Sequence, residues 1–243
     1  MTVPPFVFLA LGLLLAAQPA TVKPDKPTVN RDLDGKNSGP AEFIAAATSL
    51  TLQQDFEDAQ KVIDKGRSRF PKAHGFHLKQ GDLFDARGKI ADAFWEWQWE
   101  LMRAGAVETG PAASRNIVKY VQSDRRGLEF DEIHVALLSM AKLHSDPKGA
   151  LAELKKIEEV RGQRFALSFL IAEAHVQNRN LDTAAGIFRN LITRDPYFVP
   201  AYVELAGVLR LQGKPKDAES LDAKARGIDP SHPSLGPQVL IPR

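Results

Sequence analysis

Alanines recur along this chain at one constant interval, and this spacing constrains the fold more than any other feature of the sequence. A period of about 34 residues is typical of units built from two antiparallel helices, which cannot bury their apolar faces alone and therefore stack in series. A small residue is needed in each unit because the two helices cross closely. The residues that share the interval are Ala59 with Ala93, Ala150 with Ala184 and Ala218, and Pro196 with Pro230.

The spacing divides residues 40–232 into five units. Position twenty is alanine in every unit, and position eight is small in four of them, the exception being Leu138 in the third unit. Gly88 and Gly213 fall between the two expected helices of their units, where glycine can end a helix in the left-handed conformation. The units are expected to begin at Pro40, His74, Asp131, Phe165 and Val199.

The stretches GDLFDARGKIADAF in the second unit and YVELAGVLRLQGKPKDAE in the fifth carry the clearest family pattern. Over residues 40–232 the chain resembles the tetratricopeptide repeat family, with the third unit departing furthest from the pattern. The resemblance implies an all-α fold, a right-handed superhelical solenoid of about five helix–turn–helix repeats. It also implies a protein-binding role rather than catalysis.

The repeat loses its phase between Ala93 and Ala150, which are separated by one full period and a large part of a second. The extra segment is residues 108–130. Pro111 can open a helix in it, with Ile117 and Tyr120 on one side. We therefore expect one inserted helix and a loop, with two repeats before it over residues 41–107 and three after it over residues 131–232.

The first twenty residues contain an uncharged apolar run, Val3 to Ala17, followed by small residues. Its length of about 15 residues is short for a membrane span, which needs roughly 20. This pattern indicates a secretory signal peptide over residues 1–20 and an exported protein of the bacterial cell envelope, most simply periplasmic. No Lys or Arg precedes the run, so an uncleaved membrane anchor and a buried strand remain alternatives.

Two segments rich in proline flank the repeats. Residues 21–40 form an expected linker, in which Asp32 and Asp34 followed by Gly35 resemble half of a calcium loop. The glutamate required at the twelfth loop position is replaced by Ala41, so a polar turn is the preferred interpretation. The tail, residues 233–243, is expected to lie extended along the last repeat or to be disordered.

Composition excludes several classes of function. The absence of cysteine rules out disulfides, thiolate catalysis and Cys-ligated metals. A net charge of +2 gives no argument for binding nucleic acid. The sequence has no HExxH, GxSxG or phosphate-binding glycine loop, so no enzyme activity and no cofactor are expected. His74 and His77 could share a helix face and bind zinc, but packing or solvated histidines are the preferred interpretation.

The resemblance implies that the first helix of each repeat lines a concave groove. The side chains at these positions are mixed, acidic early and basic late in the chain, and lack the Lys, Arg and Asn set with which some family members grip a peptide carboxylate. We expect a groove for an extended or helical protein segment. The candidate partner-binding residues are Leu78, Asp82, Asp85, Val135, Ser139, Lys142, Phe169, Glu173, Val203, Gly207 and Arg210.

All three tryptophans lie within residues 95–99. Helical spacing places Trp95, Trp99 and Met102 on the face opposite the repeat core, where a second helix is normally polar. Either the inserted helix covers this face through Ile117 and Tyr120, or the face is an aromatic partner site. Two further functions stay open: homo-oligomerisation through this face, and binding of a glycan such as peptidoglycan. A membrane association is expected only if the N-terminal segment is not cleaved.

Overall fold

The computed structural model describes residues 33, 38–105, 107–122 and 127–236. Within these ranges the chain forms eleven α-helices and no β-strand, which confirms the predicted all-α helical repeat solenoid. No helix in the described part is long and apolar enough to span a membrane. The predicted signal peptide, the acidic residues of the half calcium loop and the tail beyond residue 236 lie outside the described residues.

The helices before and within the insertion form a first stack. Two antiparallel pairs are followed by one single helix, which packs against the second pair. This single helix occupies the stretch in which the phase of the repeat is lost. The pairs are α2 (Pro40–Leu52) with α3 (Phe56–Arg69) and α4 (Phe76–Ala86) with α5 (Ile90–Ala104), and the single helix is α6 (Thr109–Val121).

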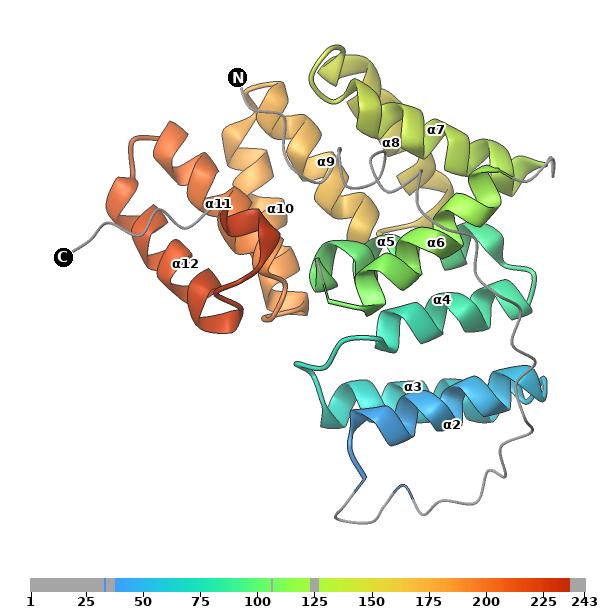
Figure 1. Cartoon of the computed structure of the whole chain (residues 1–243). Coiled ribbons are helices and arrows are strands. Elements are labelled where there is room, and N and C mark those ends of the chain that lie inside the picture. Colours follow the sequence, from blue (N-terminus) through green and yellow to red (C-terminus); the bar gives the residue numbers. More distant parts are fainter. Residues whose placement is uncertain (1–32, 34–37, 106, 123–126, 237–243) are drawn as a thin grey trace.

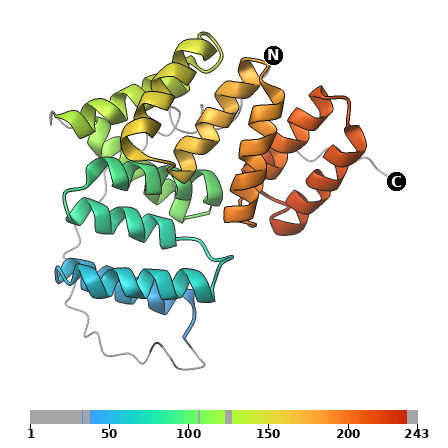
Figure 2. The ribbon, with the colours of Figure 1, turned by 180° about the vertical axis from the view of Figure 1, so that it is seen from behind.

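The remaining helices form a second stack of three pairs, which runs away from the first at an angle (Figures 1 and 2). The pairs α9–α10 and α11–α12 start at the residues expected from the alanine spacing, Phe165 and Val199. A short 3-10 turn, Pro233–Leu235, follows the last pair. The pairs are α7 (Leu128–Lys142) with α8 (Pro147–Arg161), α9 (Phe165–Gln177) with α10 (Leu181–Arg194), and α11 (Val199–Leu211) with α12 (Pro215–Ile228).

Close crossing explains the small residues of the repeat. The five alanines at position twenty are each at most 1% exposed. At position eight of the second unit, a Cβ added to Gly81 would lie 2.4 Å from the Trp97 ring. Since real atoms do not approach so closely, the helix pair α4–α5 depends on a residue without a side chain at this point.

Helix α5 belongs to both stacks. It packs against α4 and α6 on one side and against α7, α9 and α11 on the other. The Glu129 carboxylate of α7 accepts hydrogen bonds from the first backbone N–H groups of α5, at Ile90 (2.8 Å) and Ala91 (3.3 Å). This carboxylate therefore caps the start of α5 from the second stack, a favourable position for a negative charge.

Four of the five turns between the helices of a pair repeat one backbone conformation, the exception being the turn between α7 and α8. Gly88 and Gly213 have φ of 74° and 75°, which confirms the left-handed conformation predicted for them. The same position of the first and fourth units is occupied by Gln54 and Arg179, also with positive φ, 63° and 62°. A residue with a Cβ is strained there by roughly 1–2 kcal/mol relative to glycine.

We expect Arg179→Gly to raise the free energy of unfolding by about 1 kcal/mol and Gly213→Ala to lower it by a similar amount. A Cβ at Gly213 would meet no atom within 4 Å, so the loss would come from the backbone alone. Urea unfolding followed by far-UV circular dichroism measures both changes. Gly207→Ala is the control: Gly207 lies inside α11 with open space around it, so the same substitution should stabilise. Equal effects at positions 207 and 213 would contradict the backbone argument.

Candidate functional site

The face of α5 that carries Trp95, Trp99 and Met102 lies at the junction of the two stacks. Trp95 is 2% exposed, and its indole N–H donates to the Glu132 carboxylate of α7 at 3.1 Å. The Trp99 indole stacks on Phe165 of α9, with ring centroids 3.9 Å apart and planes within 1°. Met102 is 4% exposed. These residues therefore join the two halves of the molecule rather than presenting an open aromatic surface.

The prediction that the inserted helix covers this face through Ile117 and Tyr120 is corrected by the contacts of α6. Tyr120 stacks on Trp97, on the repeat-core side of α5, with ring centroids 5.6 Å apart. The physical reason is position: α6 follows α5 as the first helix of another repeat would, and so it packs against α4 and α5. The second stack takes the opposite face.

The predicted groove residues of α4 are engaged by α6. Asn116 donates a hydrogen bond to Asp82 at 2.9 Å, and the Tyr120 hydroxyl donates one to Asp85. The neighbouring Leu78 is buried in the main hydrophobic core. Asp82 also accepts from the Trp97 indole at 3.2 Å and from Lys79 at 2.9 Å. These acidic side chains therefore hold the inserted helix in place.

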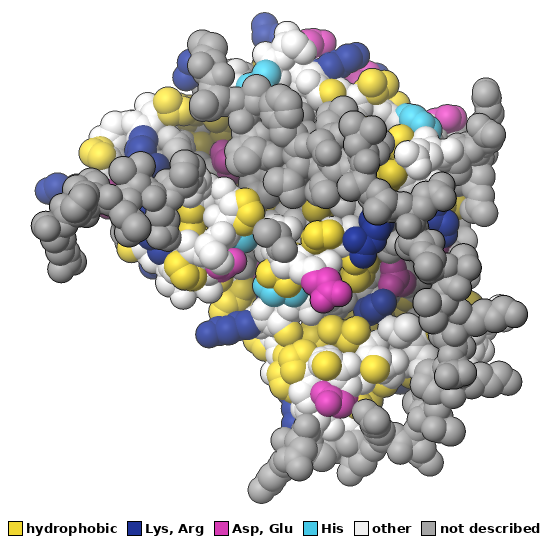
Figure 3. Space-filling view, viewed as in Figure 1, with side chains coloured by type: hydrophobic (Ala, Val, Ile, Leu, Met, Phe, Trp, Pro, Cys, Tyr) yellow, Lys and Arg dark blue, Asp and Glu magenta, His cyan; other side chains and the backbone are white. Residues whose placement is uncertain are grey.

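Groove residues of the second stack fall into three groups by exposure. Ser139 and Phe169 are buried, the latter against the rings of Phe188 and Phe198. Lys142 and Arg210 are exposed, Arg210 in an ion pair with Asp222, whereas Val135, Val203 and Gly207 are half-buried. The face of the molecule shown in Figure 3 mixes hydrophobic, acidic and basic side chains over the first stack.

Glu173 of α9 lies close enough to Glu204 of α11 for the two carboxyl groups to interact. The groove pattern did not include Glu204, because this residue comes one position after the groove position Val203. Burial raises the pKa of the Glu173 carboxyl well above its usual range, and the charge of Glu204 raises it further. Burial raises the pKa of Glu204 to about 7. The pair therefore holds protons at a pH at which exposed glutamates have lost theirs.

This pair makes stability depend on pH. The folded chain keeps a proton on Glu204 that the unfolded chain releases above a pH of about 4.3. The contribution of Glu204 to the free energy of unfolding is therefore fully present below that pH and is lost as the pH rises to about 7. From pH 5 to pH 8 we expect a loss on the order of 2 kcal/mol, which Glu204→Gln should reduce but not abolish, because burial alone still raises the pKa of Glu173. Urea unfolding at both pH values, with the exposed-site variant Glu159→Gln as control, checks this; identical pH slopes for Glu204→Gln and wild type would contradict it.

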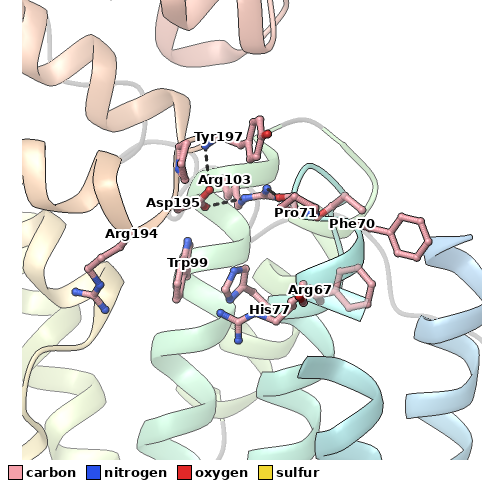
Figure 4. Close-up of a pocket in the computed structure, with 13 residues that line it drawn as sticks. Arg67, Phe70, Pro71, His77, Trp99, Arg103, Arg194, Asp195 and Tyr197 are labelled. Atoms are coloured by element: carbon pink, nitrogen blue, oxygen red, sulfur yellow. Dashed lines mark hydrogen bonds and ion pairs between the residues drawn. The ribbon is translucent and has the colours of Figure 1, made fainter. Parts of the chain in front are cut away.

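A cavity of about 270 Å³ opens at the junction of the stacks and is the candidate binding site (Figure 4). The end of α3, the following loop with Phe70, and the first turn of α4 form one wall. Trp99 and Arg103 come from α5, and the segment from Arg194 to Tyr197 closes the other side. The site thus draws on both stacks and exists only where they meet.

A stacked pair of rings forms the centre of this junction pocket. His77 stacks on Trp99 with centroids 3.7 Å apart, and its Nδ1 lies 2.9 Å from a Glu96 carboxylate oxygen. His74 precedes α4, which begins at Phe76, so the two histidines do not share a helix face as the zinc alternative required. No group of three potential metal-ligating side chains occurs among the described residues.

Arg103 and Asp195 form a buried ion pair across the junction. The two side chains are 4% and 7% exposed, and Arg103 Nε donates to Asp195 at 2.9 Å. The other guanidinium nitrogens donate to the carbonyl oxygens of Ala73 at 2.9 Å and Pro71 at 2.6 Å. Asp195 also accepts from the Tyr197 backbone N–H at 3.0 Å. These bonds fix the loop of the first stack to the end of α10, so the role of the pair is structural.

Two further arginines reach the pocket. The Arg67 guanidinium lies over the Trp99 ring, 5.5 Å from its centroid, and that of Arg194 lies 5.3 Å from the Phe165 centroid. Figure 4 shows them on the two sides of the Trp99 ring. Both belong to the last turns of second helices, so the groove positions of a repeat could not reveal them. The only available signal was the basic residue in the last turn of α3 and α10.

Comparison with known protein families identifies the repeats. The sequence model described as "Tetratricopeptide repeat" matches residues 44–106 and 169–233, which together make up just over half of the chain. The first range covers α3 to α5 and most of α2, and the second covers α10 to α12 and most of α9. No curated protein matches the chain.

Proposed function

Because the chain belongs to the tetratricopeptide repeat family, we propose that it is a non-catalytic scaffold of the cell envelope that binds a protein partner at the junction pocket. Repeats of this family are in general protein–protein interaction modules, and the proteins that carry them are usually not enzymes. The family alone does not fix a partner or a binding surface. The choice of the junction pocket comes from its side chains.

The composition of the junction pocket is the observation that supports partner binding. Trp99, Tyr197 and three arginines line it, and Trp, Tyr and Arg are the residue types that contribute most binding energy at protein interfaces. Its volume of about 270 Å³ is below the roughly 300–1,000 Å³ of pockets for drug-sized ligands. It therefore suits one or two side chains of a partner better than a free cofactor.

Export to the cell envelope is supported by the apolar run Val3 to Ala17 and the small residues that follow it. A chain without cysteine is also compatible with an oxidising compartment, since it has no thiol to protect. Fractionation of native cells tests the location, and N-terminal sequencing of the purified protein tests cleavage near Ala17 or Ala20. Recovery of an unprocessed chain in the cytoplasmic fraction would overturn this part of the proposal.

Site-specific photo-crosslinking tests the binding surface. A benzophenone amino acid at Ser68, an exposed residue of the pocket wall, should cross-link a discrete protein in native cells. The same amino acid at Lys156, exposed on α8, is the matched control and should not. The cross-linked protein, once purified, should bind the full-length chain directly. Cross-linking that is absent or equal from both positions would refute the junction pocket as the partner site.

The alternatives have less support. The His77 and Phe165 rings stack on the Trp99 indole, and Trp95 and Trp97 are at most 2% exposed, so the described residues offer no open tryptophan face for a sugar. Homo-oligomerisation through the same face meets the same obstacle. Sedimentation at several protein concentrations separates it from the scaffold proposal, because a self-associating chain gains mass with concentration whereas a scaffold awaiting its partner does not.

A further inference from the structure

We propose that the last described turn of the chain is a pH-sensitive contact, which an uncharged His232 holds on α5 and which mild acid releases by protonating this ring. This C-terminal turn comprises residues 229–236, which follow α12 and include the 3-10 turn. The inference does not rest on the proposed function, because it concerns how the end of the chain is held on α5 and not what the chain binds.

The hydrogen bonds of the His232 ring require one protonation state. The ring is 2% exposed, and its Nε2 atom lies 3.2 Å from the carbonyl oxygen of Met102 in α5. Because a carbonyl oxygen can only accept, Nε2 carries a hydrogen. The backbone N–H of Ser234 donates to Nδ1 at 3.2 Å, so Nδ1 carries none. Only the neutral ring with its hydrogen on Nε2 satisfies both partners.

The C-terminal turn packs closely on the end of α5. Gly105 ends this helix with φ of 54°, and a Cβ added to it would lie 2.7 Å from Pro233 and 3.4 Å from His232 Nε2. Within the turn, the Asp229 carboxylate accepts from the Ser231 backbone N–H at 2.9 Å and from its hydroxyl at 2.7 Å. The His232 ring therefore sits between two fixed pieces of backbone and has little room to rotate.

A second proton on His232 is incompatible with this contact. It places an N–H on Nδ1 directly opposite the N–H of Ser234, so that two donors face each other. It also places a positive charge on a ring that has almost no contact with water. A buried group without its hydrogen-bond partner costs free energy, and a charged one costs more. The turn avoids both costs by leaving α5, because water then solvates the charged ring.

The groups around His232 act on its pKa in both directions. Burial has the largest effect and lowers the pKa of His232. The Asp229 carboxylate and the backbone of Met102 and Arg103 raise it, whereas the charge of His74 lowers it further. The pKa of the docked ring stays below its ordinary value. The contact is therefore fully present above about pH 6.5, where a free histidine is neutral, and is weakened as the pH falls below this value.

His74, in the loop before α4, responds to acid in the same direction. Its Nδ1 lies 3.4 Å from Nη1 of Arg103, a group that can only donate, so this nitrogen also carries no hydrogen. Burial lowers the pKa of His74, and the charge of Arg103 lowers it further, although Glu100, Asp229 and Asp195 raise it. Acid thus adds charge on both sides of Arg103, at the same end of α5.

Contacts of the turn with the second stack do not titrate in mild acid. The 3-10 turn packs against α11 and α12, where Leu235 lies on the apolar cluster of Val199, Tyr202 and Ala225. The Tyr202 hydroxyl donates to the carbonyl oxygen of Pro196 at 3.0 Å, and burial raises the pKa of Tyr202, so this group stays uncharged. Acid therefore separates the turn from α5 while Leu235 remains on the second stack.

Amide hydrogen exchange of the full-length chain at pH 7 and pH 5, followed by NMR, measures the release. The reporter is the Ser234 amide, with its rate corrected for the intrinsic effect of pH. His232→Gln is the test variant, because a glutamine side chain has both an N–H donor and a carbonyl acceptor but does not titrate. His144→Gln, at an exposed histidine after α7, is the matched control. The amide of Ala172, buried in α9, reports global unfolding.

We expect the corrected exchange of the Ser234 amide to be at least about threefold faster at pH 5 than at pH 7 in the wild type and in His144→Gln. His232→Gln should lose most of this acceleration, and the Ala172 amide should not follow it. Equal rates at the two pH values in the wild type, or the same acceleration in His232→Gln, would overturn the inference. Equal acceleration at Ala172 would also overturn it, because acid would then unfold the whole chain.

The ring nitrogens of His232 give a second measurement that does not depend on a variant. Their ¹⁵N chemical shifts at pH 7 should show a protonated Nε2 and a bare Nδ1, the tautomer that the Met102 and Ser234 contacts require. The opposite tautomer, or a ring already charged at pH 7, would overturn the inference even if His232→Gln failed to fold.

Discussion

Replacing Arg103 with alanine should lower the free energy of unfolding by about 3–5 kcal/mol, the largest single effect that the structure predicts outside the helix cores. The substitution leaves the buried Asp195 carboxylate without its cation and the carbonyl oxygens of Pro71 and Ala73 without their donor. Each unpaired buried group costs free energy because water cannot replace the lost partner. Urea unfolding at pH 7 measures the change.

The matched control for this prediction is Arg210→Ala. Arg210 also forms an arginine–aspartate pair, with Asp222, but the arginine is exposed to solvent. Exposed pairs contribute about 0–1 kcal/mol, so this variant should stay close to the wild type. Equal losses at positions 103 and 210 would show that the junction does not depend on the buried pair.

Replacing Trp99 with alanine should lower the free energy of unfolding by about 3 kcal/mol or more. The substitution removes the ring that stacks on both His77 and Phe165 and supports Arg67, so it opens a cavity at the meeting point of the stacks. Trp99→Phe keeps an aromatic ring in the stack. It also removes the Trp99 indole N–H, which is buried without a hydrogen-bond partner, so it should cost less than about 1.5 kcal/mol.

Thermal unfolding followed by circular dichroism separates the two Trp99 variants. If Trp99→Ala were as stable as wild type, the stacked rings would not hold the junction together. The prediction also bears on binding experiments: a partner lost on Trp95→Ala/Trp99→Ala would reflect a broken junction as readily as a lost contact. Cross-linking from Ser68, which leaves the stacked rings intact, is therefore the sharper probe of the pocket.

The repeat architecture was predictable because it rests on local rules. The alanine spacing, the small residue opposite Trp97 and the left-handed glycines each reflect contacts within one helix pair. The inserted helix was foreseen for the same reason, from the break in the spacing and Pro111. Which face of α5 it covers was not, because that depends on the second stack, whose contact residues Glu132 and Phe165 come much later in the chain.

The site was less predictable than the fold. The family pattern directs attention to first helices, and it placed Asp82 and Asp85 in an open groove that the inserted helix fills. Two of the three arginines of the junction pocket, Arg67 and Arg194, come from the ends of α3 and α10, which are separated by the inserted helix and several repeats. The repeat period does not predict that they line the same pocket, because they come together only where both stacks pack against α5. Only one member of the buried glutamate pair could be predicted from the sequence, because Glu173 occupies a groove position of its repeat and Glu204 does not.

The shared position of α5 also has a consequence for the order in which the protein folds as the chain emerges, N-terminus first, from the ribosome or from a translocation channel. In a simple linear array, each repeat can complete its contacts as soon as the next one has been synthesised. Here Arg103 cannot form its ion pair until Asp195, much later in the chain, is available, and Trp99 cannot stack until Phe165 is available. Until then the nascent first half exposes tryptophan rings and an unpaired arginine. We therefore expect the early repeats to need a chaperone until the later helices have emerged, and to remain incompletely folded when expressed alone.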